Sequence, residues 1–561
     1  MFIPATIEEI QSLGWDKLDV VLVTGDAYLD SPGNGVSVIG HMLIDAGFRV
    51  GIISQPHMQS DSDITRLGEP LLFWGVTSGS VDSEISNFTA SGKRRKRDDL
   101  TPGGMNTRRP NRAVIAYSNL IRQYYKNTAS IVIGGIEASL RRIAHYDFRD
   151  NAIRRSILFD AKADILVYGM GERQVIELAC ALRDKEDYRN IRGICYRSDG
   201  IPDDSKEIPP FEKVVSDPHK FQEMFLAFYK NNDFRKSKVL IQKHGDKYLV
   251  QNPPAQSLSM EELDSIFGLP YERDVHPLHN EEGKVKALET VQFSVTTHRG
   301  CFGGCHFCSI NIHQGREVIS RSNVSIVNEI ESMTEHIRFK GIIPDLGGPT
   351  ANMYGMKCRK KGGGMCIDKA CVFPEVCSSL DVSHEKLLAL LKKVRAIKKI
   401  RKIFVASGMR HDLVMHDAED GEAYLEDVVR YHVSGQLKLA PEHSESNVLK
   451  CMGKPDTSSL LAFKKLFEKL NRKSEKKQFL TYYFIAAHPG STMEHMKALK
   501  KFISKKLHIT PEQVQVFTPS PSTLSTLMYH TCLDPFSGEK IFVEKNKGAR
   551  EKQKRIITNK I

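Results

Sequence analysis

A regular alternation of short apolar runs with amphipathic helical stretches is the feature that most constrains the fold of this chain. From Val291 onward there are six such apolar runs: VQFSVTT, GIIPDLGG, RKIFVASG, GQLKLAPE, FLTYYFIAAHPG and QVQVFTPSP. Apolar side chains at helical spacing lie between them, for example at Ile326, Ile330, Met333 and Ile337. Six strand–helix units in succession predict a curled parallel sheet or partial barrel, in which chemistry occurs at the carboxyl ends of the strands.

The first 231 residues show a similar rhythm. Runs such as DVVLVTGD, RVGIISQ and DILVYG alternate with helical patterns, which predicts an open parallel α/β domain over 1–231. Gly33, Gly35 and Gly40 are spaced as GxG-x4-G, which is not the dinucleotide-binding spacing, and no GxxxxGK[ST] phosphate loop is present. The sequence therefore favours neither a nicotinamide site nor a nucleoside-triphosphate site, and it names no ligand for this domain.

The remaining boundaries follow from changes in composition. Residues 232–288 are rich in Pro, His and acidic side chains and are predicted to connect the first domain to a core over 289–533. A cysteine-rich insertion over 356–380 interrupts this core, and a basic tail occupies 534–561. Ser491 to Glu494 has the pattern of a capping box and predicts the start of a helix.

Composition and charge indicate a cytoplasmic protein. No stretch approaches 18 consecutive apolar residues, and the amino terminus lacks the pattern of a secretory signal, so we expect no membrane contact. The net charge of +12 is spread mainly over helix faces, where it favours solubility. Two denser runs, Lys93 to Arg97 and the basic tail, leave contact with a nucleic acid as an alternative.

Residues 299–309, RGCFGGCHFCS, place three cysteines at C-x3-C-x2-C spacing directly after the first run of the core. Three thiolates can bind three irons of a cubane and leave the fourth iron open to a ligand. A zinc ion could instead take His306 or His298 as its fourth ligand. A disulfide framework is disfavoured in a reducing compartment.

A second group of cysteines follows the second run of the core. Cys358, Cys366, Cys371 and Cys377 lie in a glycine-rich stretch with little periodicity, which is typical of a loop folded around a metal. The spacing is not that of a zinc ribbon. An auxiliary iron–sulfur cluster, a structural zinc and unmetallated thiols all remain open, whereas the four other cysteines are interpreted as packing residues.

These motifs resemble the radical S-adenosylmethionine (SAM) superfamily and, more narrowly, its YgiQ family. The matching stretches include SVTTHRGCFGGCHFCSI, DLGGPTANMYG, ASGMRHDL, LKLAPEH, FIAAHPGST and VQVFTPSP. The resemblance implies that Cys301, Cys305 and Cys308 bind a [4Fe–4S] cluster whose open iron is chelated by SAM. It further implies reductive cleavage of SAM to a 5′-deoxyadenosyl radical that abstracts hydrogen from a substrate. An electron donor such as flavodoxin or ferredoxin is then required.

The resemblance also suggests residues that contact SAM. Many superfamily members carry Gly-Gly-Glu after the second strand, and here Gly347, Gly348 and Pro349 stand at those positions, so the carboxylate is missing. The carbonyl groups of the two glycines are the expected partners of the SAM amino group. Arg410 is expected to bind the SAM carboxylate, and Glu442 the ribose.

Three further expectations concern the first domain and rival functions. The first domain resembles the cobalamin-binding fold, but the absence of a DxHxxG motif argues against cobalamin. A tRNA-modifying or cobalamin-assisted group transferase is an alternative within the enzymes. A zinc-stabilised nucleic-acid-binding protein is the alternative outside them. The sequence indicates neither the substrate nor the oligomeric state.

Overall fold

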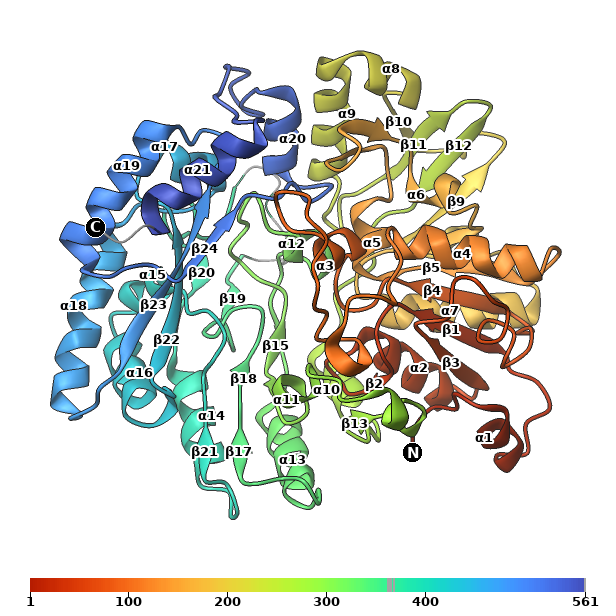
Figure 1. The fold of residues 1–561 in the computed structure, drawn as a ribbon, viewed down its shortest axis with the longest axis horizontal. Helices are drawn as coiled ribbons and strands as arrows, with labels where there is room; N and C mark the ends of the chain where they lie inside the picture. The colour runs from red at the N-terminus through yellow and green to blue at the C-terminus, as the bar shows by residue number, and fades with distance from the viewer. Residues whose placement is uncertain (361–365, 367–368, 559–561) are drawn as a thin grey trace. The chain divides into compact units, whose positions relative to one another are not determined.

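The computed structural model describes residues 1–360, 366 and 369–558 of the chain (Figure 1). The chain divides into two compact units, of which the first comprises Met1–Gln256 and Gly268–Gln292. The second comprises Ser257–Phe267 and Phe293–Ile561. The chain therefore enters the second unit at Ser257, returns to the first at Gly268 and enters the second again at Phe293. This division differs from the expected boundaries at 231 and 289.

A nine-stranded sheet forms the first unit. Five of its strands are parallel, and in spatial order they are β3 (Val50–Ser54), β1 (Val20–Thr24), β4 (Phe73–Thr77), β5 (Ser130–Ile133) and β8 (Ile165–Val167). The sheet continues through β9 (Ile194–Ser198), β12 (Lys247–Gln251), β11 (Val239–His244) and β10 (Ser205–Ile208). The joins β8–β9, β9–β12 and β12–β11 are antiparallel, so the expectation of an all-parallel sheet is wrong for this half.

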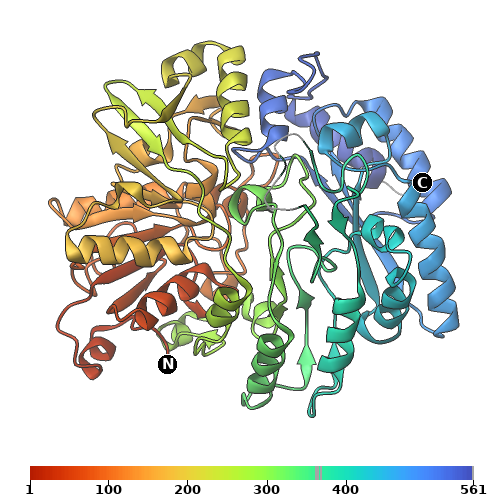
Figure 2. The same ribbon diagram turned by 180° about the vertical axis from the view of Figure 1, so that it is seen from behind.

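Helices cover both faces of this sheet. Helix α7 (Glu172–Asp184) faces the viewer in Figure 2 and α4 (Ala113–Tyr124) faces the viewer in Figure 1. Strands β1 and β3 are buried along their whole length, which explains their uninterrupted apolar sequences. The other helices of the unit are α1 (Ile7–Ser12), α2 (Gly35–Asp45), α3 (Ser83–Asn87), α5 (Gly135–Leu140), α6 (Ile157–Asp160), α8 (Phe211–Ser216), α9 (Pro218–Lys230) and α11 (Leu288–Val291). Two short pairs complete it, β2 (Leu29–Asp30) with β13 (Asp274–Val275) and β6 (His145–Asp147) with β7 (Ala152–Arg154).

The segment 232–288 is structured, in contrast to the connector that its composition suggests. Strands β11 and β12 form a hairpin whose two-residue turn is Gly245–Asp246, and both strands bury apolar side chains in the sheet. A Gly-Asp pair between two apolar runs is a known hairpin signal, which the composition of the segment obscures. Helix α10 (Met260–Phe267) then belongs to the second unit.

Strands from the six apolar runs of the second unit pair in parallel, each run with the next, and the second run contributes two short strands. β14 (Val295–Thr296) pairs with β18 (Leu346–Gly347), and β17 (Ile342–Ile343) pairs with β21 (Lys402–Ile403). A parallel bridge joins Met409, downstream of β21, to Leu439 in β22 (Gln436–Glu442). β23 (Phe479–Ala486) and β24 (Gln513–Val516) extend the series. Two antiparallel pairs flank it, β15 (His298–Arg299) with β16 (Ile319–Ser320) and β19 (Lys357–Cys358) with β20 (Leu380–Asp381).

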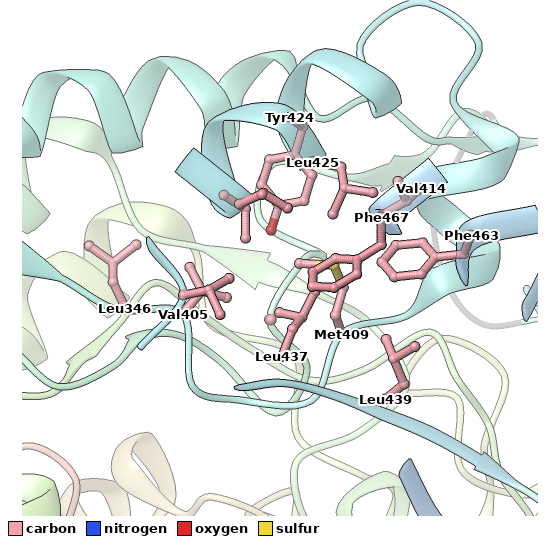
Figure 3. Packing of buried hydrophobic residues seen from close by; sticks show 14 of the residues in the cluster. Leu346, Val405, Met409, Val414, Tyr424, Leu425, Leu437, Leu439, Phe463 and Phe467 are labelled. Carbon is pink, nitrogen blue, oxygen red and sulfur yellow. The ribbon is translucent and has the colours of Figure 1, made fainter. Parts of the chain in front are cut away.

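Amphipathic helices pack against these strands around one core, part of which Figure 3 shows. Side chains from the strands, such as Leu346 and Leu437, meet Tyr424, Phe463 and Phe467 from the helices (Figure 3). The helices of this core are α13 (Asn323–Thr334), α14 (Glu385–Arg395), α15 (His411–His416), α16 (Gly421–Asp427), α18 (Ser458–Lys473), α19 (Met493–Phe502) and α21 (Lys547–Thr558). The unit also contains α12 (Ile310–His313), α17 (Ser446–Met452) and α20 (Leu524–Thr531).

Two details of the expected helices differ from the structure. Ile337 is 96% exposed because α13 ends at Thr334, so it does not share the buried stripe of Ile326, Ile330 and Met333. The capping box before α19 is formed by Thr492 with His495, one residue later than Ser491 with Glu494. The helix and the capping box are therefore both present, but each differs from the expected position by a few residues.

The basic tail is a packed element through its described part. Helix α21 buries Arg550, Gln553 and Ile557 and contacts α19, β23 and β24. Its exposed side carries most of the lysines, which is why the sequence resembles a free basic tail. Among the described residues, no helix combines the length and the apolar character needed to cross a membrane.

Candidate cluster and cofactor site

The three-cysteine loop begins directly after β15 and is shaped by its own backbone. A Cβ at Gly300, whose φ is +79°, would lie 1.8 Å from the carbonyl oxygen of Glu317, so only glycine can begin the loop. The amide of Gly303 donates to Sγ of Cys301 at 3.3 Å, and the amide of Cys308 donates to the carbonyl of Cys305 at 3.1 Å. The loop therefore holds its three thiols together in a compact turn.

The thiols of Cys301, Cys305 and Cys308 line a cavity of about 170 Å³. Burial raises the pKa of Cys301 and of Cys308, so a bound metal would have to displace their protons. The other walls of the cavity lie at or just beyond the ends of the parallel strands, at Pro349–Thr350, 408–412 and 440–442. Residues 454–457, which follow helix α17, complete them. This is the edge at which such strand arrangements place their chemistry.

Arg410 lies in this wall beside the thiols. Its Nη1 donates to Sγ of Cys305 at 3.9 Å, and its Nε donates to Oδ1 of Asp412 at 2.9 Å. Its backbone amide is held by Oδ1 of Asn352 at 2.8 Å. Burial opposes ionisation of both partners, but the ion pair outweighs it, lowering the pKa of Asp412 to about 2 and raising that of Arg410. The guanidinium is thus a permanent positive charge held in a fixed orientation toward the cysteine loop.

Glu442 ends β22 in an unusual conformation. Its φ is +67°, and a register irregularity separates it from Leu439 in the pairing with β23. The carboxyl group is buried, which raises its pKa, and its Oε1 lies 3.8 Å from Nζ of Lys454. Left-handed backbone at a non-glycine residue is costly and tends to occur at functional sites.

Gly347 and Gly348 do not line the cavity. The carbonyl of Gly347 accepts a hydrogen bond from the amide of Thr297 at 2.7 Å, within the β14–β18 ladder. A Cβ at Gly348 would lie 2.6 Å from the imidazole ring of the fully buried His298. Both glycines are thus engaged at this strand end, and their contact with SAM stays a prediction.

Two cavity residues were missed by sequence reasoning. The hydroxyl of Thr350 is buried and makes no hydrogen bond within the described part of the chain, although it lies in the cavity wall. Lys454 is also in the wall, and its ammonium donates to the carbonyl of Ala440. Thr350 follows the Gly-Gly-Pro motif and could have been suspected from it, whereas no sequence signal distinguishes Lys454 from other lysines.

The second group of cysteines lies in the same unit. Cys358 is in β19, and the amide of Cys377 donates to the carbonyl of Cys371 at 2.9 Å. The thiol of Cys371, whose pKa burial raises to about 11, lies within electrostatic range of Cys358, Cys366 and Cys377. Residues 361–365 and 367–368 of this insertion lie outside the described residues.

Neither group of thiols is arranged for a single ion. Among the described residues, no three histidine, cysteine, aspartate or glutamate side chains converge on a position that would hold one metal ion. The thiolates of a cubane bind different irons, so they need not converge in this way. The geometry of the three-cysteine loop is therefore compatible with a cluster.

Comparison with known proteins identifies the family. A family model described as "Radical SAM N-terminal" matches residues 2–294. A UPF0313 protein of Fusobacterium nucleatum is 51% identical over 561 residues, with 100% of this chain and 99% of the relative covered. The chain belongs to the UPF0313 family of radical SAM proteins. A UPF0313 protein of Thermotoga neapolitana is 46% identical, with 99% and 98% covered. The resemblance to the YgiQ-type family is confirmed, and the chain is a radical SAM enzyme.

Two solved structures have a similar fold. The methyltransferase TsrM of Kitasatospora setae, with cobalamin and a [4Fe–4S] cluster bound, has a TM-score of 0.52 at 15% identity and covers 91% of this chain and 77% of its own. The cobalamin-dependent enzyme OxsB, with aqua-cobalamin bound, has a TM-score of 0.52 at 12% identity and covers 91% and 55%. At these identities the likeness concerns the fold: a mixed α/β architecture with a large parallel sheet.

Proposed function

We propose that the chain binds a [4Fe–4S] cluster through Cys301, Cys305 and Cys308, binds SAM in the adjoining cavity, and cleaves it reductively to abstract hydrogen from a substrate. One observation carries the proposal. The three thiols, a fixed guanidinium and the buried carboxyl group of Glu442 line the same cavity at the carboxyl ends of parallel strands. The strand series then corresponds to the six-unit partial barrel of a radical SAM core.

The side chains of the cavity have separable roles in this proposal. When bound, the cluster supplies the electron that breaks a carbon–sulfur bond of SAM. Arg410 offers a permanent positive charge to the SAM carboxylate and partly neutralises the thiolates beside it, because Asp412 fixes its orientation. Glu442 accepts a hydrogen bond from a ribose hydroxyl, and the unpartnered hydroxyl of Thr350 supplies a further polar contact.

Cys305→Ala tests this proposal. Reconstituted anaerobically and reduced, the wild type should convert SAM to 5′-deoxyadenosine, or supply this radical to a substrate, whereas Cys305→Ala should form none. A reduced flavodoxin or ferredoxin is the class of donor that we propose in the cell. Cys180→Ala, which changes a half-buried thiol on α7, is the matched control and should retain the wild-type rate. Equal rates for wild type and Cys305→Ala would contradict the assignment.

The first unit does not fit cobalamin in this proposal, although both solved relatives bind it. Open α/β sheets bind ligands beyond the carboxyl ends of their strands, at the point where strand order reverses, which here lies between β1 and β4. The fully buried Arg109 fills this point. Its Nη1 donates to the carbonyl of Ser78 at 2.5 Å and pairs with Asp26 at 2.8 Å. Its Nη2 pairs with Asp98 at 3.0 Å.

This ion-pair network is closely surrounded by other groups. The second carboxylate oxygen of Asp26 accepts from the amide of Ser80 at 2.6 Å, and a Cβ at Gly79 would lie 2.1 Å from Oδ1 of Asp26. A planar macrocycle at this edge would have to displace a buried guanidinium and leave two buried carboxylates unpaired, which is strongly unfavourable. The reaction that we propose therefore does not use cobalamin.

A further inference from the structure

The proposed function leaves four thiols of the second unit unused. Cys358, Cys366, Cys371 and Cys377 lie on the insertion that β19 and β20 close at its base. The sequence separation of these cysteines reaches 19 residues, yet the thiols of Cys358, Cys366 and Cys377 all act electrostatically on Cys371. Tertiary structure, and not a short motif, brings these four thiols together.

The insertion packs directly against the three-cysteine loop. Cys371 and Cys377 share one hydrophobic cluster with Cys301 and Phe302. A Cβ at Gly304 would lie 3.9 Å from Cβ of Ala370, which places the chain next to Cys371 against the middle of the loop. The second group of thiols is therefore adjacent to the site of the first cluster.

Two cationic side chains near this contact, Arg316 and Lys360, could interact with a bound anion. Nη2 of Arg316 donates to the carbonyl of Lys369 at 2.8 Å. Nε of the same side chain is buried without a hydrogen-bond partner within the described part of the chain. Lys360 extends its Nζ to within 3.0 Å of Sγ of Cys366. A cluster held by four thiolates is negatively charged and offers sulfur atoms that accept hydrogen bonds, so it would satisfy both cations.

We infer that Cys358, Cys366, Cys371 and Cys377 bind a second iron–sulfur cluster beside the first. A cluster is favoured over zinc because its sulfur atoms would accept hydrogen bonds from Arg316 and Lys360. Four thiolates also match the usual ligand set of an iron–sulfur cubane. This inference rests on the proposed function only in taking the neighbouring three-cysteine loop to hold the first cluster.

Metal analysis of three proteins tests the inference. Iron, acid-labile sulfide and zinc are measured after anaerobic reconstitution in the wild type, in the triple variant Cys301→Ser/Cys305→Ser/Cys308→Ser, and in the double variant Cys371→Ser/Cys377→Ser. We expect each variant to hold about half of the wild-type iron and sulfide, since each retains one four-iron site. Cys180→Ser, which changes a half-buried thiol on α7, should match the wild type.

Electron paramagnetic resonance of the reduced proteins separates the two sites. Addition of SAM should change the signal of the double variant, whose open iron remains, and should leave the signal of the triple variant unchanged. If the triple variant held no iron and the double variant held as much iron as the wild type, the inference would be overturned and the proposed function would stand. Stoichiometric zinc in place of iron in the triple variant would overturn it as well. A wild type without any cluster would refute both the inference and the proposed function.

Discussion

At the scale of single residues, the ring of His298 determines which side chain can occupy position 348. The ring is fully buried, and its Nδ1 lies 2.9 Å from the hydroxyl of Thr297. Because the imidazole is fixed in this way, it leaves no room for a Cβ at Gly348. The glycine that the family resemblance suggests as a SAM contact is thus required by the packing of the strand end.

Gly348→Val should therefore destabilise the protein without weakening SAM binding by the folded fraction. Overpacking of a buried site costs about 1–3 kcal/mol, so the thermal midpoint should fall. Gly200→Ala is the control for stability, because an added Cβ there meets no atom within 4 Å. Thermal unfolding and SAM titration of the reconstituted variant decide between the two roles. A weakened SAM affinity with an unchanged midpoint would show that the backbone at 348 contacts the cofactor.

At the scale of elements, helix α21 completes the end of the strand series. Oε1 of Gln553 accepts a hydrogen bond from the amide of Ala487 at 2.9 Å, and Nε2 of Gln553 donates to the carbonyl of Ser491 at 3.0 Å. Both partners lie just beyond β23, where the backbone has left its ladder. A polar side chain from the carboxyl-terminal helix thus satisfies backbone groups that the sheet itself cannot reach.

Gln553→Ala should destabilise the second unit by about 1–3 kcal/mol, because it leaves the buried amide of Ala487 without an acceptor. Lys552→Ala changes the neighbouring exposed side chain and should leave stability nearly unchanged. Thermal or denaturant unfolding of both variants measures the difference. Equal stabilities would mean that α21 is an appendage and not part of the folded unit.

At the scale of the whole molecule, the fold is similar to that of cobalamin-binding enzymes, whereas the side chains of the first unit disfavour cobalamin. The chain shares its fold with two enzymes whose structures contain cobalamin. The switch point of its own sheet is nevertheless filled by Arg109 and its two carboxylate partners. Similarity of fold does not carry a ligand with it, because ligand binding depends on the side chains at the site.

The chain should accordingly fail to bind cobalamin. Incubation of the full-length protein with hydroxocobalamin, followed by gel filtration, should yield a protein fraction without the absorption of the corrin ring. Anaerobically reconstituted protein should behave in the same way, since the Arg109 network does not involve the cysteines. Stoichiometric co-elution of the corrin would contradict this expectation and would favour a cobalamin-assisted group transfer.

The sequence alone determined the local features whose causes lie within a few residues. The spacing of Cys301, Cys305 and Cys308 indicated the cluster motif, and apolar periodicity located most strands and helices. The resemblance to radical SAM proteins suggested Arg410 and Glu442, and both line the cavity of the three-cysteine loop. In the hairpin of β11 and β12, polar composition masked the periodic signal, so the two strands were not expected.

Only the tertiary structure decided which distant groups meet. The ion pair of Arg109 joins residues that follow different strands, and the position of Lys454 depends on how α17 packs beside β22. The burial of α21 and the proximity of the two cysteine groups arise in the same way. Sequence patterns report the preferences of neighbouring residues, whereas these contacts depend on strand order and loop paths, which no local pattern encodes.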